Sequence, residues 1–151
     1  MRKASLNDVD QLVAMMTEFY AESSYPVNQR RAAETFAAVL SDDRLGNAWL
    51  IQADSHDVGY AVVTFCYSLE YGGLNAVLDD FFVRPAFRGL GLGSAALEEI
   101  RAFCASRGIR AIHLETGREN HSALTLYHRV GFIETKQLHM TLKLADPAHV
   151  Q

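Results

Sequence analysis

Three glycines fall at every second position in the stretch FRGLGLGSAAL, which covers residues 87–97. Arg88 precedes them, and a run of good helix formers follows them. Glycine weakens helices and strands, and it is favoured where the backbone needs a positive φ or where another group approaches closely. The stretch therefore predicts a turn that opens into a helix. The turn is either a flexible loop without a ligand or a backbone cradle for a bound group.

Two phosphate-binding designs fit this turn poorly. A Walker A loop needs Gly-Lys-Ser/Thr, and lysine follows none of the glycines. Gly91, Gly93 and Ala96 satisfy the dinucleotide pattern G-x-G-x-x-A. In that fold, however, a strand buried on both faces runs directly into the first glycine. Here RPAFR separates the strand from the glycines, the strand carries Asp79 and Asp80, and too little chain follows for a doubly wound sheet.

A third design is an arginine-led turn, R-G-x-G-x-G/A, that opens directly into a helix. Its glycines leave out Cβ atoms, so successive backbone N–H groups can close around a diphosphate. The helix N-terminus adds unpaired donors and partial positive charge. In this design Arg88 tightens the turn or approaches a phosphate.

Hydrophobic periodicity predicts the elements around this turn. A helix begins after Ser5 with a capping box to Asp8. Further elements are expected in chain order: a helix at 28–40, strands at 48–53, 58–69 and 75–83, a helix at 94–107, a strand at 109–115, a helix at 122–130, and a strand at 139–144. The short turns between the first strands favour antiparallel pairing. We therefore expect one mixed α/β (α+β) domain over residues 1–151, with a parallel contact where strand–helix–strand crosses over.

Composition and charge disfavour several classes of protein. The net charge of −4, without long basic runs, argues against a nucleic-acid partner. No apolar run follows the basic pair at the start, and no segment has a membrane-spanning length, so we expect neither a signal peptide nor a membrane anchor. Cys66 and Cys104 stand alone, which favours the reducing cytoplasm. The histidines lack metal-ligand spacing, so no metal is expected.

Two blocks of the chain resemble a known family. LDDFFVRPAFRGLGLGSAAL is similar to the signature of the GNAT superfamily of acetyl-CoA-dependent N-acetyltransferases: a strand ending in Val-x-Pro, then Arg/Gln-x-x-Gly-x-Gly/Ala, then a helix. NHSALTLYHRVGF resembles a second block, Asn-x-x-Ala-x-x-Leu-Tyr-x-x-x-Gly-Phe. The match covers about residues 77–132. It implies a mostly antiparallel twisted sheet of about six to seven strands, flanked by about four helices.

The resemblance implies acetyl-CoA as cosubstrate and assigns residues to it. The backbone of Phe81, Phe82 and Val83 would bind the pantetheine arm as an added strand. Asn120 would contact the pantetheine or phosphate region, or would serve only as a helix N-cap. The other contacts would come from the diphosphate turn and the start of its helix, and from the helix expected at 122–130: Arg88, Gly89, Leu90, Gly91, Leu92, Gly93 and Ser94 from the first, Ala123 and Tyr127 from the second.

The resemblance also implies catalytic roles. Tyr127 would donate a proton to the departing thiolate, since a phenol has a pKa near that of a thiol. LDDFFV is similar to the polyamine and thialysine acetyltransferase branch, where glutamate usually takes the first acidic position; here that position is Asp79. Adjacent strand residues point to opposite faces, so Asp79 and Asp80 are not expected to face one site. Asp79 is our choice for the base that deprotonates the acceptor amine, and Glu115 is the alternative.

The sequence says least about the acceptor, the amine that would receive the acetyl group. Tyr20, Glu22 and Tyr25 lie where the first helix ends, and aromatic with acidic groups suit an organic cation. With Asp79 and Glu115 they form the expected acceptor site. The expected reaction is direct attack by a small primary amine, such as a polyamine or an amino-acid derivative, in a ternary complex. A protein N-terminus or lysine, and a non-catalytic acyl-CoA sensor, are the alternatives. The resemblance also implies a homodimer.

Overall fold

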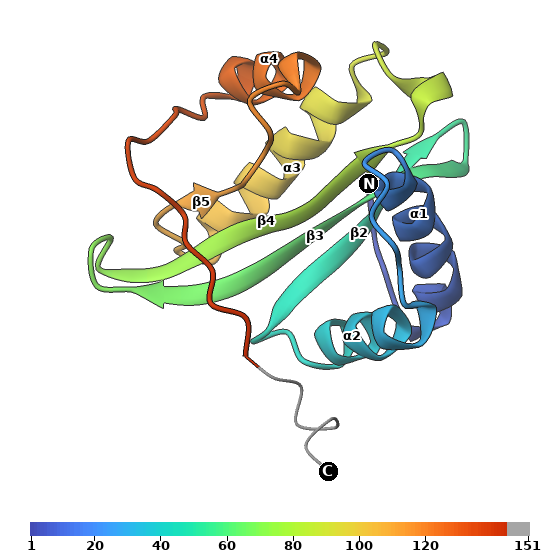
Figure 1. Cartoon of the computed structure of the whole chain (residues 1–151), viewed down its shortest axis with the longest axis horizontal. Coiled ribbons are helices and arrows are strands. Elements are labelled where there is room, and N and C mark those ends of the chain that lie inside the picture. Colours follow the sequence, from blue (N-terminus) through green and yellow to red (C-terminus); the bar gives the residue numbers. More distant parts are fainter. Residues whose placement is uncertain (145–151) are drawn as a thin grey trace.

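The computed structural model describes residues 1–144 and contains a mixed α/β fold (Figure 1). Its helices and strands follow one another as β1 (Arg2–Lys3), α1 (Val9–Ala21), α2 (Gln29–Ser41), β2 (Gly46–Ala53), β3 (His56–Ser68), β4 (Gly73–Val83), α3 (Leu92–Ser106), β5 (Ile112–His113) and α4 (His121–Val130). Short 3-10 helices at Leu6–Asp8 and Pro85–Phe87 precede α1 and follow β4. The predicted helices and the three long strands are thus confirmed, with shifts of a few residues at their ends.

The strands form one sheet in the order β1-β2-β3-β4-β5. Neighbours pair antiparallel except β4 and β5, which pair parallel through Ala76 with Ile112 and Val77 with His113. The helix α3 connects these two strands, so the predicted parallel contact lies at the strand–helix–strand crossover. The sheet has five strands within the described residues, slightly fewer than the six to seven expected.

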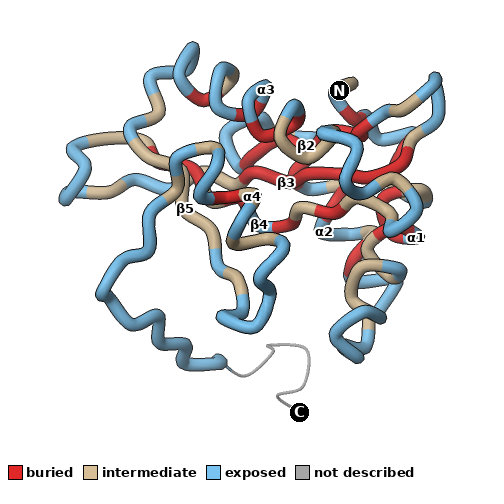
Figure 2. The backbone as a smooth tube through the Cα atoms, turned by 90° about the horizontal axis from the view of Figure 1, so that it is seen from above, coloured by how far each residue is buried: buried red, intermediate tan, exposed pale blue. Residues whose placement is uncertain are grey.

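Helices cover both faces of the sheet, and each face has its own core (Figures 1 and 2). On one face α1 and α2 pack through residues such as Leu12, Met15 and Phe36 against Tyr60 and Phe82. On the other face, α3 and α4 pack against the opposite side of the same strands, with a core that includes Trp49, Val63, Leu78, Leu97, Ile100, Cys104 and Tyr127. Buried residues concentrate along the central strands, as Figure 2 shows. The sheet therefore separates two layers of helices.

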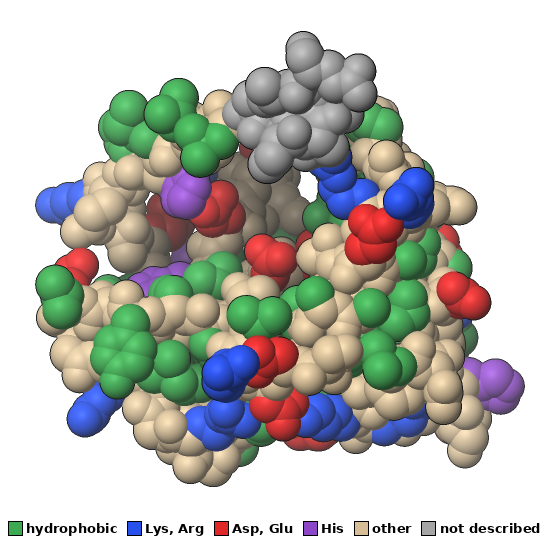
Figure 3. Space-filling view, turned by 90° about the horizontal axis from the view of Figure 1, so that it is seen from below, with side chains coloured by type: hydrophobic (Ala, Val, Ile, Leu, Met, Phe, Trp, Pro, Cys, Tyr) green, Lys and Arg blue, Asp and Glu red, His purple; other side chains and the backbone are tan. Residues whose placement is uncertain are grey.

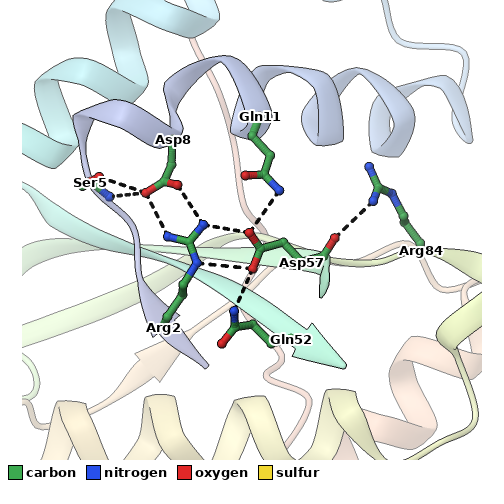
Figure 4. A network of polar contacts seen from close by, with 7 residues as sticks. All are labelled: Arg2, Ser5, Asp8, Gln11, Gln52, Asp57 and Arg84. Carbon is green, nitrogen blue, oxygen red and sulfur yellow. Dashed lines mark hydrogen bonds and ion pairs between the residues drawn. The ribbon is translucent and has the colours of Figure 1, made fainter. Parts of the chain in front are cut away.

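A polar network holds β1 and the start of α1 on the edge of the sheet (Figure 4). The Arg2 guanidinium donates to Asp8 at 2.8 Å and to Asp57 at 2.7 Å. Gln11 and Gln52 also donate to Asp57. The Asp8 carboxylate accepts the backbone N–H of Ser5 at 2.8 Å, which is half of the predicted capping box. The network fixes the entry of α1, the helix that forms one wall of the site described below.

The prediction of a closing strand at residues 139–144 is wrong. The described part of this segment has no strand structure, and its alternating apolar residues Met140, Leu142 and Leu144 are 84–87% exposed. Alternation predicts a strand only where a neighbouring strand supplies hydrogen bonds, and no strand of the described chain pairs with this segment. The strand expected at 109–115 is also shorter, because β5 diverges from β4 after His113.

Within residues 1–144, no helix is both long and apolar enough to cross a membrane.

Candidate active site

The glycine turn lies at the N-terminus of α3, which begins at Leu92, two residues earlier than predicted. Gly91 is the N-cap residue of this helix with φ +81°, and Gly89 has φ +77°. Side chains other than glycine rarely adopt such angles. A Cβ built on either glycine would meet no protein atom within 4 Å. These two glycines therefore allow the turn and leave open space in front of its backbone.

Glycine is needed at position 93 for a different reason. It lies within the first turn of α3, and a Cβ there would lie 3.1 Å from the Leu126 Cδ2 atom of α4. That contact is tighter than ordinary van der Waals packing, so Gly93 permits the close approach of α3 and α4. Of the three glycines in the stretch, two set the turn and one sets helix packing.

A cavity of about 530 Å³ opens beside this turn, and its walls come from β4, α3, α4 and the end of α1. Figure 3 shows a deep hollow in the molecular surface with acidic side chains in its walls. Most residues predicted to contact the cosubstrate line this donor cavity: Phe81, Phe82, Val83, Arg88, Gly89, Gly91, Gly93, Ser94, Asn120, Ala123 and Tyr127. Leu90 and Leu92 are not among its lining residues; Leu90 is exposed and Leu92 packs against a small core with Ile51 and Val58.

The outer edge of β4 is open beside this cavity. The parallel pairing with β5 covers only Ala76 and Val77, so from Leu78 onward the edge facing away from β3 has no strand partner among the described residues. An extended ligand can add to such an edge through main-chain hydrogen bonds. This geometry fits the predicted contact of Phe81–Val83 with a pantetheine arm.

Arg88 contacts the protein in a way that the sequence did not indicate. Its Nε donates to the Val83 carbonyl at 2.7 Å, and its Nη2 donates to the Glu22 carboxylate at 2.6 Å. The guanidinium lies 5.7 Å from the ring centre of Phe82. Arg88 therefore ties the glycine turn to the end of β4 and to the end of α1.

Tyr127 and Asn120 come from α4 and the residue before it. Tyr127 is 9% exposed, packs edge-to-face on Phe132, and lines the donor cavity. Burial raises the pKa of its phenol, so the hydroxyl holds its proton at neutral pH. Asn120 is the N-cap of α4 and accepts the backbone N–H of Ala123 at 3.3 Å. It caps the helix and also lines the cavity.

A β-bulge places Asp79 between two cavities. The β3–β4 register shifts between Val62 and Val63, which pair with Asp80 and Leu78, so Asp79 is the extra residue. The strict alternation of side chains fails at this point. Both Asp79 and Asp80 line a second cavity of about 370 Å³ between the sheet and the helices α1 and α2. The expectation that the two carboxylates do not face one site is therefore wrong.

Asp80 is a buried carboxylate on the wall of this acceptor-side cavity. Tyr60 Oη donates to it at 2.9 Å and Tyr20 Oη at 3.2 Å. Burial raises the pKa of Asp80 to about 6, and the nearby charge of Asp79 acts in the same direction. Arg31 lines the same cavity. The hydrogen bonds from the two tyrosines favour the ionised carboxylate, and an ionised carboxylate on a cavity wall can bind a cationic ligand. The sequence interpretation gave no role to Asp80 or Tyr60, because strand alternation placed Asp80 away from the site.

Asp79 also lines the donor cavity, together with Glu115. Burial raises the pKa of Asp79, and the negative charge of Glu115 raises it further. Glu115 itself pairs with His139 Nδ1 at 2.8 Å. A carboxylate with a raised pKa is a better proton acceptor, which is compatible with the role of base expected for Asp79.

The predicted acceptor residues at the end of α1 take three different positions. Tyr20 lines the acceptor-side cavity, and Glu22 lines the donor cavity. Tyr25 lines neither; it is 67% exposed and meets the Tyr20 ring edge-on at 6.5 Å. Residues 1–144 contain no group of three metal-ligating side chains.

The family of GNAT acetyltransferases matches residues 12–132. Thialysine N-epsilon-acetyltransferase from Bos taurus is 32% identical over 74 residues, which are 49% of this chain and 43% of that protein. An uncharacterized N-acetyltransferase from Archaeoglobus fulgidus is 28% identical over 129 residues, 83% of this chain and 87% of that protein.

Among solved structures, an integron cassette protein from the mobile metagenome of Cole Harbour Salt Marsh is 41% identical, with a TM-score of 0.87. The match covers 97% of this chain and 91% of that one. Against the bovine relative the chain spans less than half of the other protein's length. The chain belongs to the GNAT family of acetyltransferases, which are acyl-transferring enzymes.

Proposed function

We propose that this protein transfers the acetyl group of acetyl-CoA to a primary amine of a small molecule, by direct attack in a ternary complex. The observation that carries the proposal is the meeting of two cavities at Asp79. One has a diphosphate turn and an open strand edge. The other has a buried carboxylate suited to a cation. A thioester in the first cavity and an amine in the second would approach each other at the bulge.

On the donor side, backbone groups would make the main contacts with acetyl-CoA. The turn at Gly89–Gly93 and the N-terminus of α3 would hold the diphosphate with N–H donors. The open edge of β4 would align the pantetheine arm, which brings the thioester toward Tyr127. Acetyl-CoA supplies the activated acetyl group.

The acceptor amine arrives protonated and has to lose a proton before it attacks. Asp79 takes this proton, directly or through a water; Glu115 is the alternative base. The free amine then attacks the carbonyl carbon and the C–S bond breaks. Tyr127 donates its proton to the departing sulfur, and the second proton that the attacking nitrogen loses returns to the Tyr127 phenolate, directly or through water. The products are an acetamide and the free thiol of coenzyme A, and the proton taken by the base passes to solvent. The raised pKa of Asp79 and the protonated phenol of Tyr127 support these roles.

A small acceptor is favoured by the size and charge of the second cavity. It holds about 370 Å³ between two helices and the sheet, and Asp80 faces it. The bovine relative is named for the ε-amine of thialysine, a small amine. A protein N-terminus or a lysine side chain is the alternative acceptor.

The test is a panel of amines and peptides, with purified protein and acetyl-CoA and with free thiol as the readout. We expect diamines and amino-acid amines to release coenzyme A faster than peptides do. Release with peptides alone would replace the small-molecule acceptor by a protein acceptor. Tight coenzyme A binding in calorimetry, with no turnover on any amine, would instead support an acyl-CoA sensor.

A further inference from the structure

The acceptor-side cavity carries charges of opposite sign on different elements. Asp79 and Asp80 reach it from β4, and Arg31 reaches it from the first turn of α2. Arg31 is the one positively charged side chain among the described residues that line this cavity. Most of the other walls are apolar or uncharged, for example at Met16 and Val62. A few charged groups in such a wall fix the orientation of a bound small molecule.

The two kinds of charge lie at different depths. Asp80 is 9% exposed, and Val62, its partner on β3, and Phe36 are 5% and 6% exposed. Arg31 is exposed, as is Pro26 in the connection between α1 and α2, which also lines the cavity. The cavity therefore has a buried acidic end and a basic rim.

The spacing of the two ends follows from helix α2. Its Phe36 ring meets the Tyr60 ring edge-on at 6.1 Å, and the Tyr60 hydroxyl donates to Asp80 at 2.9 Å. Arg31 lies five residues before Phe36 in the helix, which corresponds to about 7.5 Å along the helix axis. A small molecule with two charged ends can therefore meet the acidic end and the basic rim at two separate places.

Contacts within α2 hold the backbone of Arg31. Its N–H donates to the Asn28 side chain at 3.0 Å, and its carbonyl accepts the Thr35 hydroxyl at 2.8 Å. Asn28 and Thr35 line the same cavity, so this face of the helix is fixed toward it. A guanidinium has five N–H donors, and a carboxylate takes two of them in a bidentate pair. Arg31 can thus bind a carboxylate and keep other partners.

We propose that the acceptor carries a carboxylate as well as its reactive amine, and that Arg31 binds this carboxylate at the rim of the acceptor-side cavity. The substrate class is then an amino acid or a similar zwitterion rather than a polyamine. Asp79 and Asp80 receive the ammonium end, and Arg31 receives the anionic end, so the amine is directed toward the bulge. This inference rests on the proposed function, because it concerns the acceptor of the same reaction. Arg31 sets specificity and takes no part in the proton transfers.

The same charge pattern disfavours other amines. A polyamine carries only positive charges, so one of its ammonium groups would lie near Arg31 and would be repelled. Within a peptide, the carboxyl group of a lysine is part of an amide, so it offers no charge for Arg31 to pair with. Repulsion of the first kind of amine and the missing pair of the second kind together select a zwitterion.

Matched pairs of acceptors test the proposal. Lysine and cadaverine, ornithine and putrescine, and β-alanine and ethylamine each differ by one carboxylate. The assay uses purified protein and acetyl-CoA, with free thiol as the readout. In the pair that reacts fastest, we expect kcat/KM to be about tenfold higher for the member with the carboxylate, because it gains charge-assisted hydrogen bonds from the guanidinium.

Two substitutions separate Arg31 from the general charge of α2. Arg31→Met should lower the preference for the carboxylate about tenfold. The matched control is Arg30→Met, which removes the same charge one position earlier and should keep the wild-type preference. Arg30 is 90% exposed, pairs with Glu34 at 2.9 Å and is not among the described residues that line the cavity. Arg31→Lys keeps the charge without the bidentate geometry and should retain part of the preference. A loss of stability would slow both members of a pair alike, so the ratio reports specificity.

The possible results distinguish this inference from the proposed function. If the carboxylate-bearing members have an equal or lower kcat/KM in the wild type, the acceptor is not a zwitterion and the proposal is overturned. A preference that Arg31→Met leaves unchanged, or that Arg30→Met reduces as much, also overturns it. These results leave the proposed function in place, because coenzyme A is still released. If no amine releases coenzyme A, the proposed function itself fails, and this inference fails with it.

Discussion

Asp80 presents a negative charge to a cavity in which its described hydrogen-bond donors are the hydroxyl groups of Tyr20 and Tyr60. Its pKa is raised to about 6, first by burial, so the carboxylate is mostly ionised at neutral pH and mostly protonated at pH 5. Only the ionised form attracts an ammonium group. The affinity for a cationic acceptor should therefore follow the titration of this one residue.

Replacing Asp80 by asparagine tests this inference. Asp80→Asn should raise the KM for a cationic amine about 10- to 100-fold, because a charge-assisted hydrogen bond contributes about 1.5–3 kcal/mol. The KM for acetyl-CoA should stay the same. In the wild type, the affinity for the amine should fall as the pH drops through about 6, and the variant should lack this decline. Binding is the readout because kcat also depends on the proposed base Asp79.

Tyr60→Phe is the control for that assignment. It removes a donor that favours the charged form of Asp80, so the decline should move to higher pH instead of disappearing. A decline that remains near pH 6 in both variants would mean that another group titrates.

The proposed role of Tyr127 as general acid can be tested by removing its hydroxyl group alone. Tyr127→Phe should lower kcat by about 100-fold, the usual size of a lost general acid, while coenzyme A binds as before. Steady-state kinetics and calorimetry measure the two quantities. A variant with wild-type kcat would leave Tyr127 as a packing residue between α4 and the sheet.

More of the residues predicted for the donor side than of those predicted for the acceptor side line a single cavity. The glycine turn, Asn120 and Tyr127 belong to contiguous blocks, and local geometry brings them to one cavity. The pair Asp79 and Asp80 depends on a β-bulge, and a bulge arises from the pairing of two strands. No local pattern in β4 signals it. The contact between Arg88 and Glu22 could not be predicted from local sequence either, because the two residues lie 66 positions apart in the chain.

At the scale of single elements, the clearest prediction concerns the glycine turn at the N-terminus of α3. Gly91→Ala puts a Cβ into the space in front of the turn and strains a backbone with φ +81°. We expect coenzyme A affinity to fall at least tenfold in calorimetry.

Gly108→Ala is a matched control for Gly91→Ala. Gly108 has φ +69° at the other end of α3 and also has open space around it. Both variants should lower the melting temperature by a similar amount, but only Gly91→Ala should weaken coenzyme A binding. An equal loss of affinity in both variants would mean that stability, not the cradle, sets the affinity.

Helices were predictable from the sequence because capping residues and 3.6-residue periodicity are local. Asn28 caps α2 by accepting the Arg31 N–H at 3.0 Å, and Gly108 follows the last turn of α3 with φ +69°. The end of the chain was not predictable in this way. Residues 139–144 alternate as a strand does, but whether an alternating segment is a strand depends on a partner elsewhere.

At the scale of the whole molecule, the polar network around Arg2 leads to a prediction about the stability of the fold at low pH (Figure 4). Hydrogen bonds from Arg2 lower the pKa of Asp8 to about 2 and also lower that of Asp57. A lowered pKa stabilises the fold above the unfolded value, near 4, and this contribution is lost as the pH falls toward 2. Arg2→Met should destabilise the protein by about 2 kcal/mol at neutral pH. The difference from wild type should shrink between about pH 4 and pH 2, as thermal melts can measure.

Arg44→Met is the comparison variant. Arg44 pairs with Asp42 at 2.7 Å, but the Arg44 side chain is 89% exposed. Such surface pairs contribute little, so the melting temperature should hardly change. Equal effects of the two substitutions would mean that the burial of Asp8 and Asp57 has no influence.

Of the described residues that line the two cavities, Asp79 alone belongs to both. The other walls come largely from different parts of the chain: α1, α2 and their connection on the acceptor side, and β4, α3 and α4 on the donor side. Substitutions that reshape the walls on the acceptor side leave most of the walls on the donor side unchanged. A lineage with this architecture can therefore change its substrate by mutations in its first 40 residues or so while it keeps its cosubstrate. Laboratory selection for a new acceptor should accumulate its changes there.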